Sequence, residues 1–159
     1  MIVFHGSTLE IKTPDIMHSK GNLDFGVGFY VTTFQKQAER WAARKGMRLN
    51  KPAIVNVYEV GGISGYNVRE FEDTDLEWLR FVVECRNGAD IYKSFDAIRG
   101  NVANDDVFKC VSMYMDGIWD ESRTLGEIKY YEKNDQIAFL SQVIIDNAVV
   151  FLESYEVMK

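Results

Sequence analysis

The sequence has few of the residues that cross-link a chain, interrupt it or bind metals. Among its 159 residues are only two cysteines, two prolines and two histidines. Cys85 and Cys110 are isolated from each other, and each lies in an apolar pattern of helical spacing. We therefore expect two reduced core thiols, rather than a disulfide or a zinc site, and no bound metal.

Long apolar runs and targeting signals are also missing. No segment approaches the roughly 20 apolar residues that a membrane span requires. The N-terminal MIVFHGSTLEI has neither the basic region nor the apolar core of a secretion signal. Repeats, low-complexity tracts and linkers are absent too. These features predict a cytoplasmic protein without membrane association, folded as one domain over residues 1–159.

Positive charge is scarce, because the formal net charge is -6. This argues against broad backbone-driven binding of nucleic acid, which needs clustered Lys and Arg, although it does not exclude a nucleic-acid partner. The densest basic cluster lies on one predicted helix and consists of Arg40, Arg44, Lys45 and Arg48. A solvated helix face is the favoured interpretation. The alternative is a local patch for a small anionic ligand.

Apolar periodicity predicts short strands mixed with helices. The expected strands cover residues 2–4, 29–33, 54–60, 95–98, 137–140 and 149–157. Expected helices cover residues 34–42, 76–83, 107–114 and 123–131. Capping-box spacing places Thr32 and Gln35 at the start of the first helix, and Thr74 and Glu77 at the start of the second. Without regular βαβ alternation, the pattern predicts an α+β fold.

The stretch LDFGVGFYVTT, residues 23–33, contains two motifs that mislead. Its DFG lacks the upstream glycine-rich loop and the HRD segment of a kinase, in a chain too short for that fold. Its GVG precedes a strand-like segment and no lysine follows, so it is not a phosphate loop. A structural interpretation is a tight turn fixed by Asp24 and Phe25, with positive φ at Gly26 and Gly28. Phe29 should then point into the core.

Three segments indicate a functional site when they are considered together, in their order along the chain. FHGS ends a strand with a histidine and a glycine, GFYVT supplies a tyrosine after a glycine, and NDQIAF places an amide before a strand. This order resembles the NAD-dependent ADP-ribosyltransferases of the diphtheria-toxin and PARP type. More closely, the chain resembles a bacterial family of that clade, the domain of unknown function 3990. That resemblance also rests on IKTPDI, QAERWA, EWLRFVVECR and FDAIRGNVANDD, and spans nearly all of the chain.

The resemblance implies a split, twisted β-sheet with flanking helices, and NAD bound as a substrate. His5 matches the histidine that binds the adenosine ribose, and Gly6 matches the glycine that meets the nicotinamide carboxamide. Tyr30 matches the tyrosine that stacks on nicotinamide, as an aromatic face suits a cationic ring. Ser7 and Gly28 complete the expected NAD-binding set. Without the resemblance, His5 would be interpreted as a structural histidine and Tyr30 as a core residue.

The third expected catalytic residue departs from the family pattern. Gln136 stands where many active relatives carry glutamate, and an amide can bind a ribose hydroxyl but supplies no formal charge. Glu132 lies four positions upstream, where a solvated helix-end carboxylate is the favoured interpretation. Asn134 occupies the position linked to acceptor choice in related toxins, so the acceptor remains open. Asp105 is expected to cap a helix.

The resemblance therefore predicts an NAD-dependent mono-ADP-ribosyltransferase of the bacterial toxin-like kind, with His5, Tyr30 and Gln136 as its catalytic residues. Its partners would be NAD, an unknown ADP-ribose acceptor and, in a toxin–antitoxin pair, a cognate antitoxin protein. Two alternatives use the same residues. One is an NAD glycohydrolase with water as the acceptor. The other is a catalytically silent nucleotide-binding or interaction module, because Gln136 replaces glutamate.

Overall fold

The protein folds as two β-sheets with flanking helices, so the predicted α+β class is confirmed. The structure, a computed structural model, describes residues 1–19 and 23–158. The strands are β1 (Ile2–Ser7), β2 (Phe29–Val31), β3 (Ile54–Val60), β4 (Val68–Glu70), β5 (Ala97–Asn101), β6 (Asp135–Phe139) and β7 (Val149–Glu156). The helices are α1 (Gln35–Leu49), α2 (Leu76–Arg86), α3 (Asp105–Met115), α4 (Glu121–Ile128) and α5 (Gln142–Ala148), with a short 3₁₀ helix η1 (Ile91–Ser94).

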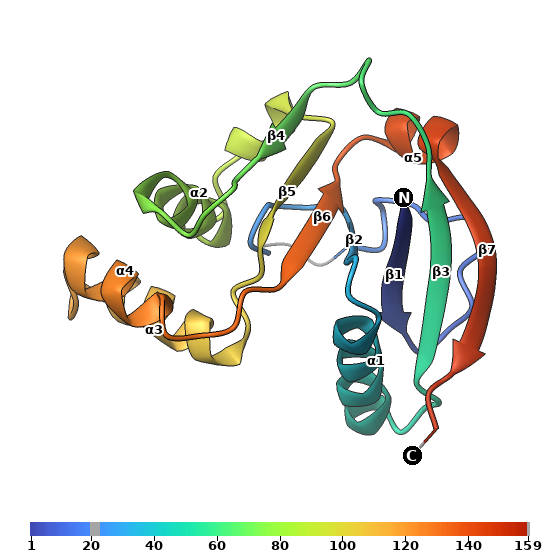
Figure 1. The fold of residues 1–159 in the computed structure, drawn as a ribbon, viewed down its shortest axis with the longest axis horizontal. Helices are drawn as coiled ribbons and strands as arrows, with labels where there is room; N and C mark the ends of the chain where they lie inside the picture. The colour runs from blue at the N-terminus through green and yellow to red at the C-terminus, as the bar shows by residue number, and fades with distance from the viewer. Residues whose placement is uncertain (20–22, 159) are drawn as a thin grey trace.

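The two sheets stand side by side and are joined at one point (Figure 1). The first has the strand order β1-β3-β7 and is antiparallel; the second has the order β2-β6-β5-β4, with only β4 and β5 parallel. An isolated antiparallel bridge links Phe4 of β1 to Thr32, just after β2. The two residues exchange backbone hydrogen bonds of 2.8 and 2.9 Å. At this bridge, backbone hydrogen bonds connect the two sheets directly.

α2, α3 and α4 lie outside the second sheet, α1 lies beside the first sheet towards the middle of the molecule, and buried apolar residues fill the space between the sheets (Figure 1). α1 packs on the first sheet through Ala38 and Ala42, which contact Val55. The core between the sheets and α5 includes Val3, Phe29, Val31, Tyr58, Ile137, Phe139 and Ile144. The core beneath α2, α3 and α4 includes Phe25, Trp78, Leu79, Val82, Ile98 and Val111. Phe29 is 6% exposed, which confirms that it points into the core.

All the elements expected from periodicity are present, with boundaries shifted by a few residues. The strand expected at 54–60 has those bounds, whereas α1 runs on to Leu49, well past the expected end at residue 42. β4, α5 and η1 were not expected. β4 has three polar-rich residues and α5 only seven, too few for a period to be recognised. Both cysteines are free and buried within helices, as expected.

The predicted helix caps are wrong by one or two residues. α1 begins after Phe34 without a side-chain cap, because the Thr32 hydroxyl instead donates to Asp135 and accepts from the Phe34 N–H. α2 is capped by Asp75, whose carboxylate accepts from the Trp78 N–H at 3.0 Å. In α3 the cap is Asn104, not Asp105. In α2 and α3 the residue just after or just before the predicted cap provides the side-chain acceptor instead.

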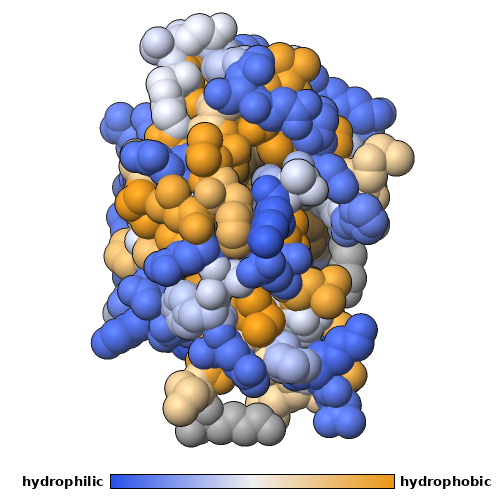
Figure 2. All heavy atoms as spheres, turned by 90° about the vertical axis from the view of Figure 1, so that its right-hand side faces the viewer, coloured by the Kyte–Doolittle hydropathy of each residue, from blue (hydrophilic) through white to orange (hydrophobic). Residues whose placement is uncertain are grey.

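β7 is an edge strand with an irregular register. Tyr58 of β3 pairs with Phe151 and Val57 pairs with Glu153, so the ladder skips Leu152 and forms a β-bulge there. Leu152 and its neighbour Val150 are exposed. Figure 2 looks at this side of the molecule and shows hydrophobic and hydrophilic side chains interleaved. In the described parts of the chain, no helix is long and apolar enough to cross a membrane.

Candidate functional site

The first expected site residues meet where β1 and β2 separate, a place we call the β1–β2 junction (His5, Gly6, Tyr30 and Trp41). In an antiparallel ladder, the hydrogen-bonded pair after Phe4–Thr32 would be Gly6–Tyr30. Instead, the His5 Nδ1 atom lies 2.6 Å from the Tyr30 carbonyl oxygen. The His5 side chain therefore takes the acceptor that the ladder would have used. The structure thus brings His5 and Tyr30 side by side.

His5 is held neutral, with one nitrogen left over. Since a carbonyl oxygen only accepts, Nδ1 carries the hydrogen and Nε2 is an acceptor. The ring stacks on Phe29, with centroids 4.5 Å apart. Burial lowers the pKa of His5 from 6.5 to about 4; the Tyr30 carbonyl opposes this shift and the charge of Lys45 adds to it. At neutral pH the His5 Nε2 atom can accept a hydrogen bond from a ligand hydroxyl.

This pKa predicts a pH-dependent stability that a non-titrating variant lacks. His5 binds a proton in the unfolded chain below pH 6.5, but in the native protein only near pH 4. Its contribution is therefore complete above pH 6.5 and is lost as pH falls towards 4, by about 1.4 kcal/mol per pH unit in that window. His5→Asn keeps a donor for the Tyr30 carbonyl but does not titrate. Urea unfolding between these pH values should show a shallower pH dependence for His5→Asn; identical slopes would contradict the assignment.

Gly6 can only be glycine, because helix α1 lies against it. A Cβ at this position would lie 2.3 Å from the Ala38 carbonyl oxygen, 2.7 Å from the Ala42 nitrogen and 2.9 Å from the Trp41 Cβ. Backbone groups alternate in direction along a strand, so the N–H and C=O of Gly6 face the same side as those of Phe4, towards β2. There the ladder has ended. Gly6 thus presents one donor and one acceptor at the junction, beside Trp41.

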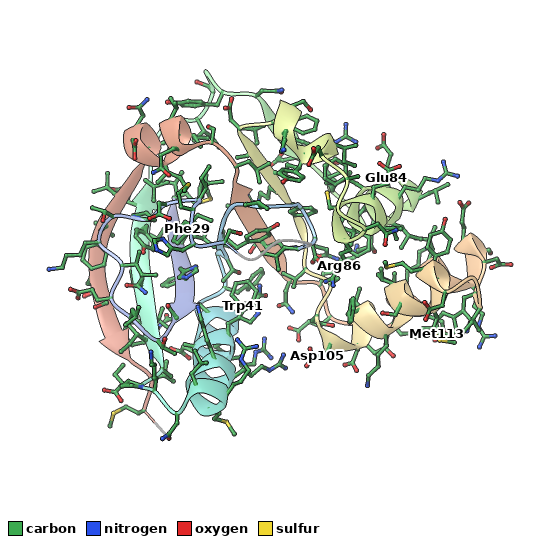
Figure 3. All side chains as sticks on the ribbon, turned by 180° about the vertical axis from the view of Figure 1, so that it is seen from behind. Phe29, Trp41, Glu84, Arg86, Asp105 and Met113 are labelled. Carbon is green, nitrogen blue, oxygen red and sulfur yellow. The ribbon has the colours of Figure 1, made fainter. Side chains whose placement is uncertain are left out.

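Trp41 is the residue of the junction that the sequence interpretation missed. QAERWA was interpreted as an apolar stripe, and its neighbours Ala38 and Ala42 are fully buried. Trp41, however, is only partly buried, and it lies on α1 near the centre of the molecule (Figure 3). A large aromatic between two small buried residues was the available signal. Its Cβ is one of the atoms that a side chain at position 6 would meet, which places Trp41 beside Gly6.

The Tyr30 side chain is fixed by the DFG turn. Its hydroxyl donates to the Gly26 carbonyl at 2.6 Å and accepts from the Phe25 N–H at 3.0 Å. Burial raises the pKa of Tyr30 well above its usual value, so the hydroxyl is no acid or base at neutral pH. The turn has positive φ at Gly26, as expected. Tyr30 therefore offers a rigid ring rather than a reactive hydroxyl.

The other two expected binding residues lie apart from the free edge of the junction. Ser7 ends β1 and is 3% exposed. Gly28 packs against β6, where a Cβ would lie 2.6 Å from the Phe139 carbonyl oxygen. The expected positive φ at Gly28 is wrong, since Gly26 is the glycine of that turn with positive φ. Position 28 needs a glycine because β2 packs closely on β6 there.

Gln136 belongs to a buried polar network rather than to an open surface. It is 4% exposed, and its Nε2 donates to the Asp24 carboxylate at 2.8 Å and to the Asn101 carbonyl at 3.4 Å. Asp24 also accepts from the Ala103 N–H at 2.9 Å and from two nitrogens of Arg86, Nε at 2.7 Å. The amide nitrogen is thus committed, and only Oε1 could meet a ligand. Tyr30 pairs with Ala138, so Gln136 lies two residues on along the same face of β6.

Asp135, next to Gln136, is a second carboxylate that the sequence interpretation gave no role. It accepts from the Thr32 hydroxyl at 3.0 Å, from the Thr33 N–H and hydroxyl at 2.9 Å each, and from Arg99 at 3.1 Å. These donors fix the start of α1 to β6. Glu132, in contrast, is exposed after α4, in agreement with a solvated carboxylate.

Two surface cavities lie elsewhere. One, of about 390 Å³, is lined by residues of β4, α2 and η1, including Arg69, Phe81 and Phe95. The other, of about 310 Å³, includes Arg99 and Asp135. Neither is lined by His5, Tyr30 or Gln136 among the described residues. The same described residues contain no cluster of three or more side chains placed to hold a metal ion.

Comparison with known proteins places the chain in a family. No curated protein matches the sequence. The family model DUF3990, described as a protein of unknown function, matches residues 1–151. The match covers β1 and β2, which form the junction, and the residues of the Gln136 network. The chain therefore belongs to the DUF3990 family of proteins of unknown function.

Proposed function

We propose that this protein is an NAD-dependent mono-ADP-ribosyltransferase with its site at the β1–β2 junction. One observation carries the proposal: the ladder stops at Phe4–Thr32, which leaves the backbone of Gly6 without a β2 partner, next to a neutral His5 and the Trp41 Cβ. The α+β fold with two sheets joined at one bridge agrees with the split sheet of such enzymes. Under this proposal the Gly6 backbone, the His5 imidazole and the aromatic side chains each contact a part of NAD.

The junction matches the nicotinamide half of NAD group by group. A carboxamide has one acceptor and two donor hydrogens, and the Gly6 N–H and C=O complement it. Trp41 and Tyr30 offer aromatic faces to the cationic pyridinium ring. The Nε2 atom of His5 accepts a hydrogen bond from a ribose hydroxyl. No side chain in this set has to change its protonation state to bind.

The reaction breaks the bond between the nicotinamide nitrogen and C1 of the ribose. The bonding electrons leave with neutral nicotinamide, and positive charge develops on the ribose. A nucleophile of the acceptor then bonds to C1 and loses a proton. Gln136 would contribute through Oε1, whose negative character is increased because its Nε2 donates to the Asp24 carboxylate. Asp24 thus acts on the site through Gln136 and is a positioning residue.

A second candidate is a silent NAD-binding module. It is favoured by the position of Gln136, whose amide is neutral, 4% exposed and tied to Asp24. Such a module would bind NAD at the same junction and leave it intact. The two candidates differ in turnover, not in binding.

The test uses NAD labelled in its adenylate part, incubated with the protein and cell lysate. We expect label retained on macromolecules; free ADP-ribose alone would indicate a glycohydrolase, and intact NAD that is bound would indicate the silent module. Trp41→Ala should weaken NAD binding by about 1–3 kcal/mol, the usual value of a stacked ring. Trp119→Ala is the matched control, since Trp119 is also partly buried but lies under Arg123 beyond α3. Equal NAD affinity for both variants would contradict the site.

A further inference from the structure

The basic stripe of α1 lies next to the junction. Arg44 follows Trp41 by three residues, and so shares its side of the helix. Lys45 is near enough to His5 for its charge to lower the pKa of that residue. The protein as a whole is acidic, with a net charge of -6, so this stripe is a local exception. A ligand that occupies the junction and carries negative charge would meet these cations.

Arg44 makes an unusual connection between two separate layers of the fold. Its Nη1 atom lies 2.8 Å from a carboxylate oxygen of Asp105, the first residue of α3. α1 covers the first sheet, whereas α3 covers the second (Figure 1). Trp41 and Asp105 are labelled on these two helices in Figure 3. The ion pair therefore spans the two layers beside Trp41.

We infer that Arg44 binds the diphosphate of the dinucleotide, and that Asp105 holds the Arg44 side chain until the ligand replaces it. The inference rests on the proposed function, because it extends the same site from nicotinamide towards the phosphates. Both side chains of the pair are more than half exposed, 62% for Arg44 and 73% for Asp105. Exposed ion pairs are weak. A diphosphate, with more charge and several oxygens, is a stronger partner for a guanidinium than one carboxylate.

If the ligand replaces Asp105 as the partner of Arg44, substitutions at these two residues should change the affinity for the dinucleotide in opposite directions. Arg44→Gln removes a contact to the ligand, so dinucleotide binding weakens. Asp105→Asn removes a competitor for Arg44, so binding strengthens. The gain in affinity from Asp105→Asn depends on Arg44: in the Arg44→Gln protein there is no arginine side chain for Asp105→Asn to release, so affinity should change little. A double-mutant cycle therefore separates this mechanism from a general change in surface charge.

The experiment measures binding of three probes by calorimetry: NAD, ADP-ribose, and nicotinamide riboside, which has no phosphate. Arg44→Gln should weaken NAD and ADP-ribose about tenfold and leave nicotinamide riboside unchanged. Asp105→Asn should tighten NAD and ADP-ribose about two- to fivefold. Lys93→Gln and Asp90→Asn are matched controls, because Lys93 and Asp90 form an exposed ion pair 3.3 Å apart at the start of η1. Each control makes the same change of charge away from the junction.

The outcomes separate this inference from the proposed function. If the wild type binds NAD but Arg44→Gln behaves like Lys93→Gln, the role of Arg44 is overturned and the proposed function stands. Equal weakening of nicotinamide riboside by Arg44→Gln would also overturn it, since the phosphates would then play no part. If the wild type binds none of the three probes, the proposed function fails and this inference fails with it.

Discussion

Asp24→Asn is expected to lower the free energy of unfolding by about 3–5 kcal/mol, the usual cost of removing one partner from a buried ion pair. The Asp24 side chain is 6% exposed and Arg86 is 20% exposed. The carboxylate serves as the acceptor for Arg86, for the Ala103 N–H and for Gln136. An amide in its place lacks the charge and turns one acceptor into a donor, facing groups that also donate.

Urea denaturation at neutral pH measures this effect, and an exposed ion pair of the same protein is the control. Arg80 and Glu121 pair at 2.9 Å with side chains 60% and 40% exposed. Glu121→Gln should therefore cost less than about 1 kcal/mol. If both variants lose the same small amount, the network around Asp24 is not the buried anchor described above. A normal stability of Asp24→Asn would also remove the proposed action of Asp24 through Gln136.

Gln136→Glu is expected to destabilise the protein at pH 8 by on the order of 3 kcal/mol, although under the proposed function the added carboxylate would favour turnover. The Gln136 Nε2 atom donates to Asp24 at 2.8 Å in a buried setting. A glutamate would place a second carboxylate against the first, and only one of them can remain charged there. Arg86 neutralises one carboxylate, not two. The gain in charge at the proposed reaction centre would thus come with a loss of fold stability.

The pH dependence distinguishes this repulsion from a simple packing defect. The carboxyl introduced by Gln136→Glu has a pKa in the folded state above that in the unfolded chain. Its protonated form is therefore tolerated at low pH, and stability is lost as pH rises through the folded-state pKa. Unfolding measured at pH 5 and pH 8 should show the larger deficit at pH 8. Gln35→Glu is the control: Gln35 also donates to a carboxylate, that of Glu39 at 3.3 Å, but on the exposed face of α1.

A deficit that does not change with pH would indicate a packing defect rather than repulsion from Asp24. If stability is unchanged at both pH values, turnover of NAD by Gln136→Glu becomes the informative measurement. Increased turnover with unchanged stability would favour the silent module for the natural chain. Stability and turnover should therefore be measured on the same preparation.

The sequence predicted the longer elements because their patterns extend over several turns or strand residues. β3 is rich in branched side chains, and α2 carries a full apolar stripe. β4 and α5 are too short to show a period, and their existence depends on β5 and on the core between the sheets. Local pattern therefore predicts an element when packing and periodicity agree over enough residues.

The site was predicted less completely, because its chemistry depends on contacts distant in sequence. His5 was identified, but its neutral form follows from burial and from a carbonyl 25 residues away. Asp24 was interpreted as a turn residue; its partner Arg86 lies 62 residues on, and Gln136 lies 112 residues on. Nothing in the local sequence around any of the three indicates the other two. Their association was visible only once the sheet had been assembled.

The bulge at Leu152 has a consequence for how this molecule meets its neighbours. An edge strand offers a row of unsatisfied backbone groups, on which another chain can build a cross-β contact. β7 is eight residues long and carries exposed Val150 and Leu152, which by themselves favour such aggregation. The extra residue interrupts the even spacing of those backbone groups, and the exposed Glu153 follows it immediately. Deleting Leu152 would regularise the edge and, by the same reasoning, turn a protected strand into a template for fibrils.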